Sequence, residues 1–280
     1  MYKKSHSAAF SLIEVLVATA ITVGTGAAIF QLFHQNERIF RDQALIVEMQ
    51  QAARMVASTI ADDIRIAGQA IPPDIDDVLL PGSDTSRLNM RAGFSATETN
   101  VTALPPLSVA IGTPVSITVE NTSGFSAGRQ AFLWSKGAWV RATINSVSGS
   151  SKTLQLTPVA GSAQTVQFTT APAISLDEAV AIYRDASTNA VRRTTATNTE
   201  DAADPSWAPA NELAANVSAL VFLYYDRNGM PLTPGSPGFN SELAAIECRI
   251  TVRPSTPLSN GSRPTFSLSI RSLPRNLWLR

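Results

Sequence analysis

The sequence is poor in cysteine. Cys248 is the only cysteine in 280 residues, so the chain cannot close an intramolecular disulfide bond. A domain built from this chain must therefore be stabilised by packing alone, even in an oxidising compartment. Cys248 lies in an alternating stretch, Ala245–Val252, which predicts a buried strand residue rather than a reactive thiol.

Histidine is almost as scarce. The two histidines, His6 and His34, both fall among the first 34 residues. The rest of the chain therefore cannot hold a Ser-His-Asp triad, a Cys-His pair around Cys248 or a histidine-based zinc site. We expect no enzymatic activity and no cofactor, although paired carboxylates for glycoside chemistry, which have no sequence signature, stay open as an alternative.

Two further segments resemble binding motifs but lack residues that those motifs require. Gly149–Thr153 looks like a phosphate-binding loop but lacks the glycine before its lysine and the required upstream residues. Asp74, Asp76 and Asp77 form the best carboxylate cluster, but the glycine and glutamate that a calcium-binding EF-hand loop needs are absent. These aspartates are predicted to lie in a surface loop, and no metal site is expected.

Net charge is also absent, since 22 basic residues balance 22 acidic ones. Such a chain lacks the electrostatic footprint of a bulk nucleic-acid binder. The charge is nevertheless uneven, because acidic residues stop after Glu247 while arginines continue to Arg280. These arginines are interpreted either as strand positions that face acidic loops or sister subunits, or as a basic surface for DNA or an anionic cell surface. The candidate basic surface is Arg249, Arg253, Arg263, Arg271 and Arg275.

One long apolar run dominates the N-terminal region. Phe10–Phe33 spans 24 residues with a single charge, Glu14, and about 20 apolar residues suffice to cross a bilayer. Lys3 and Lys4 precede the run, which predicts that they lie in the cytoplasm and that everything after Phe33 lies outside. A charge at the bilayer centre costs about 2.5–3.5 kcal/mol on insertion scales, so Glu14 is predicted to have a function in the membrane or in an assembly.

The leader itself, residues 1–9, has small residues before the apolar run, whereas a secretory signal peptide has its cleavage site after the run. Hydropathy alone leaves an uncleaved signal anchor and a special processing site as equal alternatives.

The helical pattern continues beyond the apolar run. Apolar residues recur at steps of three and four up to Ala67, and no proline interrupts them. Gly68 is a natural helix stop, and Pro72-Pro73 forbids continuation. We therefore predict one helix with a transmembrane half, 10–33, and an amphipathic half, 34–68, that packs on a globular domain.

From Ile71 the period changes to two, which is typical of strands. Short alternating runs between clusters of Gly, Ser, Pro and Asn predict an antiparallel β domain over 69–280, and hence an α+β fold. Segments 72–86 and 198–209 are predicted to be loops. The predicted strands are Val115–Glu120, Gln130–Trp134, Ala138–Ile144, Thr153–Leu156, Thr165–Phe168, Ala179–Tyr183, Val191–Thr194, Ala219–Tyr225, Ile246–Val252 and Phe266–Ile270.

The basic leader, the small residue Ala9 and the stretch Phe10–Ala18 with its Glu14 resemble the N-terminus of type IV prepilins and type II secretion pseudopilins. In that family a prepilin peptidase cuts before the Phe, whose new amine is then methylated. The resemblance implies cleavage between Ala9 and Phe10, N-methylation of Phe10, and Glu14 as the fifth residue of the processed chain. Ala9 replaces the usual Gly, and Ser11 replaces the commoner Thr.

Within this family the chain is most similar to PilW-type minor pilins, with GspJ-type pseudopilins as near relatives. The similarity is carried by the helix end Ala61–Gly68, and more diffusely by Val180–Arg184, Ala190–Arg193, Glu212–Val217 and Phe222–Asp226. It is strong over residues 1–68, patchy over 178–280 and nearly absent over 72–177, which is interpreted as a variable insertion.

The resemblance implies a pilin-like fold, with the long helix packed on a C-terminal antiparallel sheet, and a minor pilin of a type IV pilus that acts in initiation or at the filament tip. The implied partners are prepilin peptidase, the inner membrane and other minor and major pilins. The chain would be a single-pass inner-membrane protein with a periplasmic headgroup before it enters a cell-surface pilus or a periplasmic pseudopilus. The lone cysteine argues against a major pilin, many of which close a C-terminal disulfide loop.

Three alternatives and one hypothesis follow. The chain is alternatively a minor pseudopilin of a type II secretion system, although the insertion 72–177 is large for that class. It is otherwise a tip adhesin or a DNA-uptake subunit whose insertion binds an external ligand. In any of these filaments, Glu14 of an incoming subunit is hypothesised to pair with the Phe10 amine of a neighbour.

Overall fold

The computed structural model describes residues 11–73, 75, 78–102, 105–199 and 205–274. The chain divides into two compact units. The first comprises residues up to Glu48 together with Pro254–Pro264, and the second comprises Met49–Arg253 together with the residues from Thr265 onward. The predictions for Ala9, Phe10, Asp74, Asp76, Asp77 and Arg275 concern positions outside the described residues.

A single helix, α1 (Leu12–Ile66), runs without interruption through 55 residues. At 1.5 Å per residue, its 55 residues correspond to a length of about 80 Å. Its early turns contain threonines whose hydroxyls donate to main-chain carbonyls one turn back, from Thr22 to Ala18 and from Thr25 to Ile21, each at 2.8 Å. These polar groups are therefore satisfied within the helix and do not require water.

In the second unit, α1 supplies one wall of a hydrophobic core. Its buried apolar positions recur every three or four residues, which places them along one stripe. The helix is followed by Gly68 in a left-handed conformation (φ +81°), and the Gly68 N–H donates to the Arg91 carbonyl at 2.9 Å. The buried apolar residues of this stripe are Met49, Ala53, Val56, Ala57, Ile60, Ala61 and Ile64.

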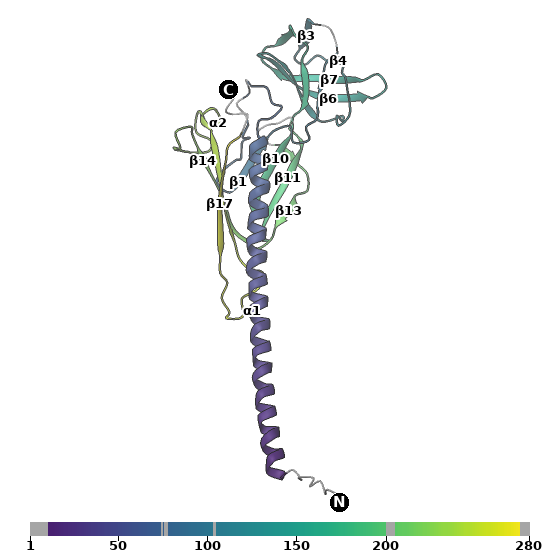
Figure 1. Cartoon of the computed structure of the whole chain (residues 1–280). Helices are drawn as coiled ribbons and strands as arrows, with labels where there is room; N and C mark the ends of the chain where they lie inside the picture. The colour runs from purple at the N-terminus through teal and green to yellow at the C-terminus, as the bar shows by residue number, and fades with distance from the viewer. Residues whose placement is uncertain (1–10, 74, 76–77, 103–104, 200–204, 275–280) are drawn as a thin grey trace, which may run out of the picture. The chain divides into compact units, whose positions relative to one another are not determined.

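Two antiparallel sheets complete this core, one on each side of the helix (Figure 1). We call these two sheets, with the part of α1 between them, the headgroup. The first has the order β1-β10-β11-β12, with β13 also paired to β11, and the second has the order β15-β14-β16-β17. Strands of the first sheet are β1 (Arg87–Arg91), β10 (Ala179–Asp185), β11 (Ala190–Asn198), β12 (Ser206–Trp207) and β13 (Asn211–Ala214). Those of the second are β14 (Val217–Tyr225), β15 (Pro231–Leu232), β16 (Ala245–Val252) and β17 (Phe266–Ser272), and a short helix, α2 (Phe239–Glu242), precedes β16.

Between β1 and β10 the chain builds a separate β structure with a hydrophobic core of its own. Its main sheet has the order β2-β9-β5-β6-β7-β4, and a β3-β8 ladder accompanies it. The two outer strands meet, because Val101 bridges Val119 and the Thr102 N–H donates to the Thr118 carbonyl at 2.9 Å. The sheet is thus closed into a barrel. Its strands are β2 (Glu98–Asn100), β3 (Leu107–Ala110), β4 (Val115–Thr118), β5 (Gln130–Ser135), β6 (Ala138–Ser148), β7 (Thr153–Gly161), β8 (Thr165–Phe168) and β9 (Ala173–Leu176).

The predicted α+β layout, a long N-terminal helix packed on an antiparallel β domain, is confirmed. All ten predicted strands overlap observed ones, but β1, β2, β3, β9, β12, β13 and β15 were not predicted. The prediction of a loop over 198–209 was wrong in part, since β12 lies there and pairs with β11. Within the segment 72–177, β1 pairs with β10 in the first sheet, and the strands of the barrel begin at β2.

We expect the stripe of α1 between the sheets to dominate the stability of the second unit. Ile60 is fully buried, so Ile60→Ala should lower the free energy of unfolding by about 2–4 kcal/mol through lost burial and a residual cavity. Met55 lies on the other side of the same helix and is 53% exposed, so Met55→Ala should change it by less than about 1 kcal/mol. Urea unfolding of the full chain in detergent, followed by tryptophan fluorescence, compares them, and equal losses would contradict the assigned core.

Candidate functional site

The candidate assembly residue, Glu14, lies in the first turn of α1. The Ser11 main-chain N–H donates to Glu14 Oε2 at 3.1 Å, and the Ile13 N–H donates to Ser11 Oγ at 3.3 Å. This reciprocal arrangement is a capping box, which satisfies main-chain N–H groups that a helix start leaves without partners. The sequence Ser11-Leu-Ile-Glu14 carries this signature, which the charge of Glu14 alone does not indicate. Phe10, the hypothesised partner of Glu14, lies outside the described residues.

The helix around and beyond Glu14 is uncovered by the rest of the chain. Every residue from Ser11 to Arg41 is exposed, including Leu12 (85%), Ile13 (71%) and Phe33 (69%). An exposed apolar surface of this size is typical of a site that contacts a membrane or another protein. Among the described residues, α1 is the one helix long and apolar enough to cross a membrane.

Further along α1, a long loop is fastened to the helix. The loop Pro254–Pro264 connects β16 to β17, and its Ser259 main-chain N–H donates to both carboxylate oxygens of Asp42, at 2.9 and 3.1 Å. The Ser259 hydroxyl donates to Asp42 as well. These hydrogen bonds stabilise the charged carboxylate and lower the pKa of Asp42. Asp42 and Ser259 are far apart in the sequence, and no pattern predicted their contact.

A second polar cluster lies where the chain passes between the first headgroup sheet and the barrel. Arg91, the last residue of β1, forms an ion pair with Asp177, two residues before β10, with 2.9 Å between Arg91 Nε and Asp177 Oδ1. The side chains are only 2% and 0% exposed. Burial raises the pKa of Asp177, and the positive charges of Arg91, Arg141 and Arg129 oppose that rise. We call the cluster of Arg91, Asp177, Arg129, Glu178 and Ser95 the neck.

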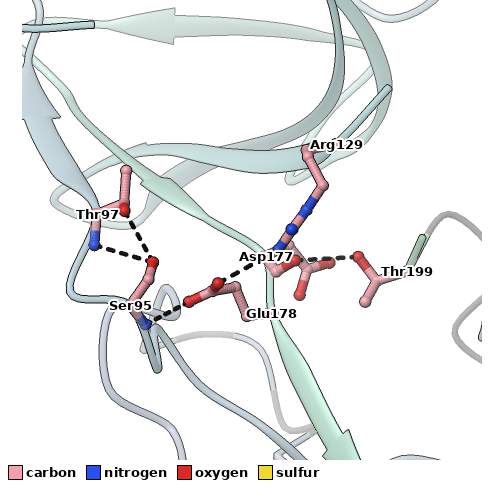
Figure 2. Close-up of polar contacts among 6 residues, drawn as sticks. All are labelled: Ser95, Thr97, Arg129, Asp177, Glu178 and Thr199. Carbon is pink, nitrogen blue, oxygen red and sulfur yellow. Dashed lines mark hydrogen bonds and ion pairs between the residues drawn. The ribbon is translucent and has the colours of Figure 1, made fainter. Parts of the chain in front are cut away.

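Figure 2 shows the polar contacts around Asp177 and Glu178 in the neck. Arg129, just before β5, pairs with Glu178 at 3.2 Å between Nη2 and Oε1, and Glu178 Oε2 accepts a hydrogen bond from the Ser95 main-chain N–H at 2.7 Å. The Ser95 hydroxyl donates to Thr97 at 2.8 Å. The segments that enter and leave the barrel are therefore joined by charge-assisted hydrogen bonds.

Four of the five arginines of the candidate basic surface lie among the described residues. Arg249 and Arg271 lie on one face of the second sheet around Glu247, which accepts from Arg249 Nε at 2.6 Å, while Arg271 stacks over the Tyr225 ring at 4.3 Å. Hydrogen bonds from Arg249, Ser269 and Tyr225 lower the pKa of Glu247 to about 2. The charge of this pair of arginines is thus partly offset by a carboxylate. Arg253 and Arg263 are exposed, at the end of β16 and in the loop Pro254–Pro264.

Cys248 is buried, as predicted, and its pKa is raised to about 12 chiefly by burial. A thiol in that environment stays protonated at neutral pH and is a poor nucleophile. In the described part of the chain, no group of three or more His, Cys, Asp and Glu side chains is placed to hold a metal ion.

We expect the neck to depend on both members of its buried pair. Asp177→Asn leaves Arg91 without its closest counter-charge and should lower the free energy of unfolding by about 3–5 kcal/mol, whereas Arg91→Met with Asp177→Leu should lower it by less. Asp62→Asn is the control, because Asp62 forms an exposed pair with Arg65 at 2.6 Å and should lose at most about 1 kcal/mol. Thermal unfolding monitored by tryptophan fluorescence measures all three. A loss for Asp177→Asn no greater than that of the control would contradict the assigned role.

Comparison with known proteins does not identify a family. The sequence matches no protein-family model, and no curated protein is significantly similar to it. Among solved structures, phage phi92 endosialidase is similar over 67% of this chain, at 11% sequence identity and a TM-score of 0.20. This chain covers 41% of the endosialidase chain. With so low a TM-score, no conclusion about fold or function is drawn from that likeness.

Proposed function

We propose that this chain is a minor pilin of a type IV pilus, processed between Ala9 and Phe10 and assembled through α1. The observation that carries the proposal is the division of α1 into two environments. Its early turns are exposed and apolar with one carboxylate, Glu14, while its later turns form the core of a headgroup. The exposed turns suit first a bilayer and then the packed helices of a filament.

Glu14 is suited to this transfer by its place in the cap. One oxygen, Oε2, accepts the Ser11 N–H, and Oε1 accepts no hydrogen bond from the described residues. Among the described residues, the carboxylate is therefore held in position through one oxygen, and its other oxygen has no donor. In the proposed filament the donor to that oxygen is the Phe10 amine of a neighbouring subunit, and their attraction sets the axial register.

The headgroup supports a place at the tip or in initiation. The barrel adds a second core beside the two headgroup sheets, and such bulk is difficult to stack repeatedly along a fibre. On this proposal the subunit resides in the inner membrane, acts with other minor and major pilins and is a substrate of prepilin peptidase. A minor pseudopilin of type II secretion would use α1 in the same way and is the alternative.

We expect the charge of Glu14, rather than its capping role, to decide assembly. Glu14→Gln retains a side-chain oxygen for the Ser11 N–H but removes the charge, so it should reduce incorporation into sheared filaments at least tenfold, as should Glu14→Ala. Ser11→Ala keeps the charge and loses about 1 kcal/mol of capping, so it should incorporate nearly normally. Quantitative immunoblots of filament and membrane fractions measure incorporation. Normal incorporation of Glu14→Gln would refute charge pairing, and intact Met1–Ala9 in the mature protein, by mass spectrometry, would refute processing.

The barrel favours a second candidate function, a ligand-binding module carried at the filament tip. It has its own core, and the strands that flank it pair directly, with Arg91 opposite Ala179. An insertion of this kind can diversify without disturbing the headgroup. Its ligand would be external, such as a host surface or DNA.

Removal of the barrel separates these two functions. Replacing residues 95–176 by a short Gly-Ser linker should leave β1 and β10 paired, since the Ala92 N–H donates to the Glu178 carbonyl at 3.0 Å outside the deleted segment. If the barrel binds a ligand, filaments should persist while adhesion or DNA uptake falls at least tenfold. Loss of filaments despite normal headgroup folding would instead assign the barrel to assembly. Filament counts by electron microscopy and adhesion and uptake assays measure the two outcomes.

A further inference from the structure

A polar stripe begins within the last turn of the apolar run of α1 and continues beyond it. Gln31, Gln35, Arg38 and Asp42 succeed one another at steps of three or four residues, so they share one face of the helix. The apolar run ends at Phe33, and Arg38 lies about 7–8 Å further along the helix axis. If the run crosses the bilayer, this stripe lies at the depth of the lipid headgroups, which extend roughly 5–8 Å beyond the hydrocarbon.

The loop Pro254–Pro264 turns this stripe into a cavity. Its attachment through Ser259 and Asp42 holds the loop beside the helix. Between them lies a cavity of about 690 Å³ that is open to solvent and large enough for a lipid headgroup. Its lining residues are Phe30, Gln31, His34, Gln35, Arg38, Ile39 and Ser259.

The cavity is suited to an anion. Among the described residues, no carboxylate lies within ion-pairing distance of the Arg38 guanidinium. The nearby carboxylates have other partners, since Glu37 lies 3.7 Å from His34 and Asp42 accepts the hydrogen bonds of Ser259. Gln31 and Gln35 add amide donors, while Phe30 and Ile39 add apolar surface toward the bilayer side and beside Arg38. An anion with an attached apolar portion fits this lining better than a free ion does.

We propose that this cavity binds the phosphate-bearing headgroup of an anionic phospholipid, with Arg38 as the principal contact. The proposal rests on the membrane orientation in the proposed function. Arg38 pairs with the phosphate, the glutamine amides donate to headgroup oxygens, and Phe30 lies against the first acyl carbons. Because the cavity is formed by α1 and by the loop that connects β16 to β17, a lipid bound there fixes how deeply this part of the subunit sits in the membrane before assembly.

The test compares two arginines of equal charge. Arg41 is also exposed and lies three residues from Arg38, but it does not line the cavity. The full chain, in a zwitterionic detergent, is titrated with short-chain phosphatidylglycerol, short-chain phosphatidylcholine or inorganic phosphate, and bound lipid is measured by native mass spectrometry. Arg38→Gln should weaken phosphatidylglycerol binding about tenfold, which corresponds to about 1.4 kcal/mol, and Gln35→Leu should weaken it less. Arg41→Gln should change it by less than about threefold.

Three results would overturn the proposal. Equal losses in Arg38→Gln and Arg41→Gln would show general attraction of basic residues to an anionic surface. Displacement of the lipid by millimolar phosphate would show a free-anion site. Binding of phosphatidylcholine as tight as that of phosphatidylglycerol would show that the site does not distinguish an anionic headgroup from a zwitterionic one. Because none of these measurements involves filaments or leader cleavage, the lipid site can fail while the proposed pilin function stands, and the reverse also holds.

Discussion

The structure depends on one helix whose first part is exposed and whose second part is buried in a protein core. Up to Arg41 its side chains are exposed and mostly apolar, and from Met49 its buried stripe lies between two sheets. A helix is suited to both environments because all its interior main-chain groups are paired within the segment. At the ends of a helix, main-chain groups lack partners within the helix. In α1 each end has specific hydrogen bonds. Ser11 and Glu14 cap the start, and Gly68 leaves the helix to donate to β1 at Arg91.

Arg91 connects the end of α1 to the neck. The Arg91 carbonyl accepts the Gly68 N–H, and the Arg91 side chain pairs with Asp177. The end of the helix, the edge of the first headgroup sheet and the entry to the barrel are thus connected through one buried arginine. A buried ion pair of this kind contributes little net stability compared with a well-packed apolar pair, but it strongly disfavours any arrangement that separates its members. We infer that Arg91 and Asp177 specify how the barrel is joined to the headgroup.

Sequence patterns predicted the elements whose burial follows a simple period. The stripe of α1 has a period near 3.6, and strands such as Val217–Tyr225 and Ala245–Val252 alternate clearly between buried and less buried positions. β1 was missed although its residues alternate between polar and apolar, because the run is only five residues long and contains no β-branched or aromatic residue. Glu14 could be identified from composition because it is the only charge in an apolar run. The Asp42–Ser259 and Arg91–Asp177 contacts could not be identified, since sheet pairing and a long loop bring together residues with no local pattern.

The attachment of the loop also restricts which face of α1 can meet a neighbour. With 3.6 residues per turn, Asp42 and the stripe below it lie opposite Phe33, Phe40 and Val47. These three residues are 69%, 70% and 49% exposed. A neighbouring helix packed on the Asp42 face would have to displace the loop, whereas one packed on the opposite face buries aromatic and aliphatic side chains without disturbing it. In the proposed filament, the loop therefore selects the face that carries Phe33 and Phe40 for helix packing, and Glu14 supplies the charge that sets the register along it.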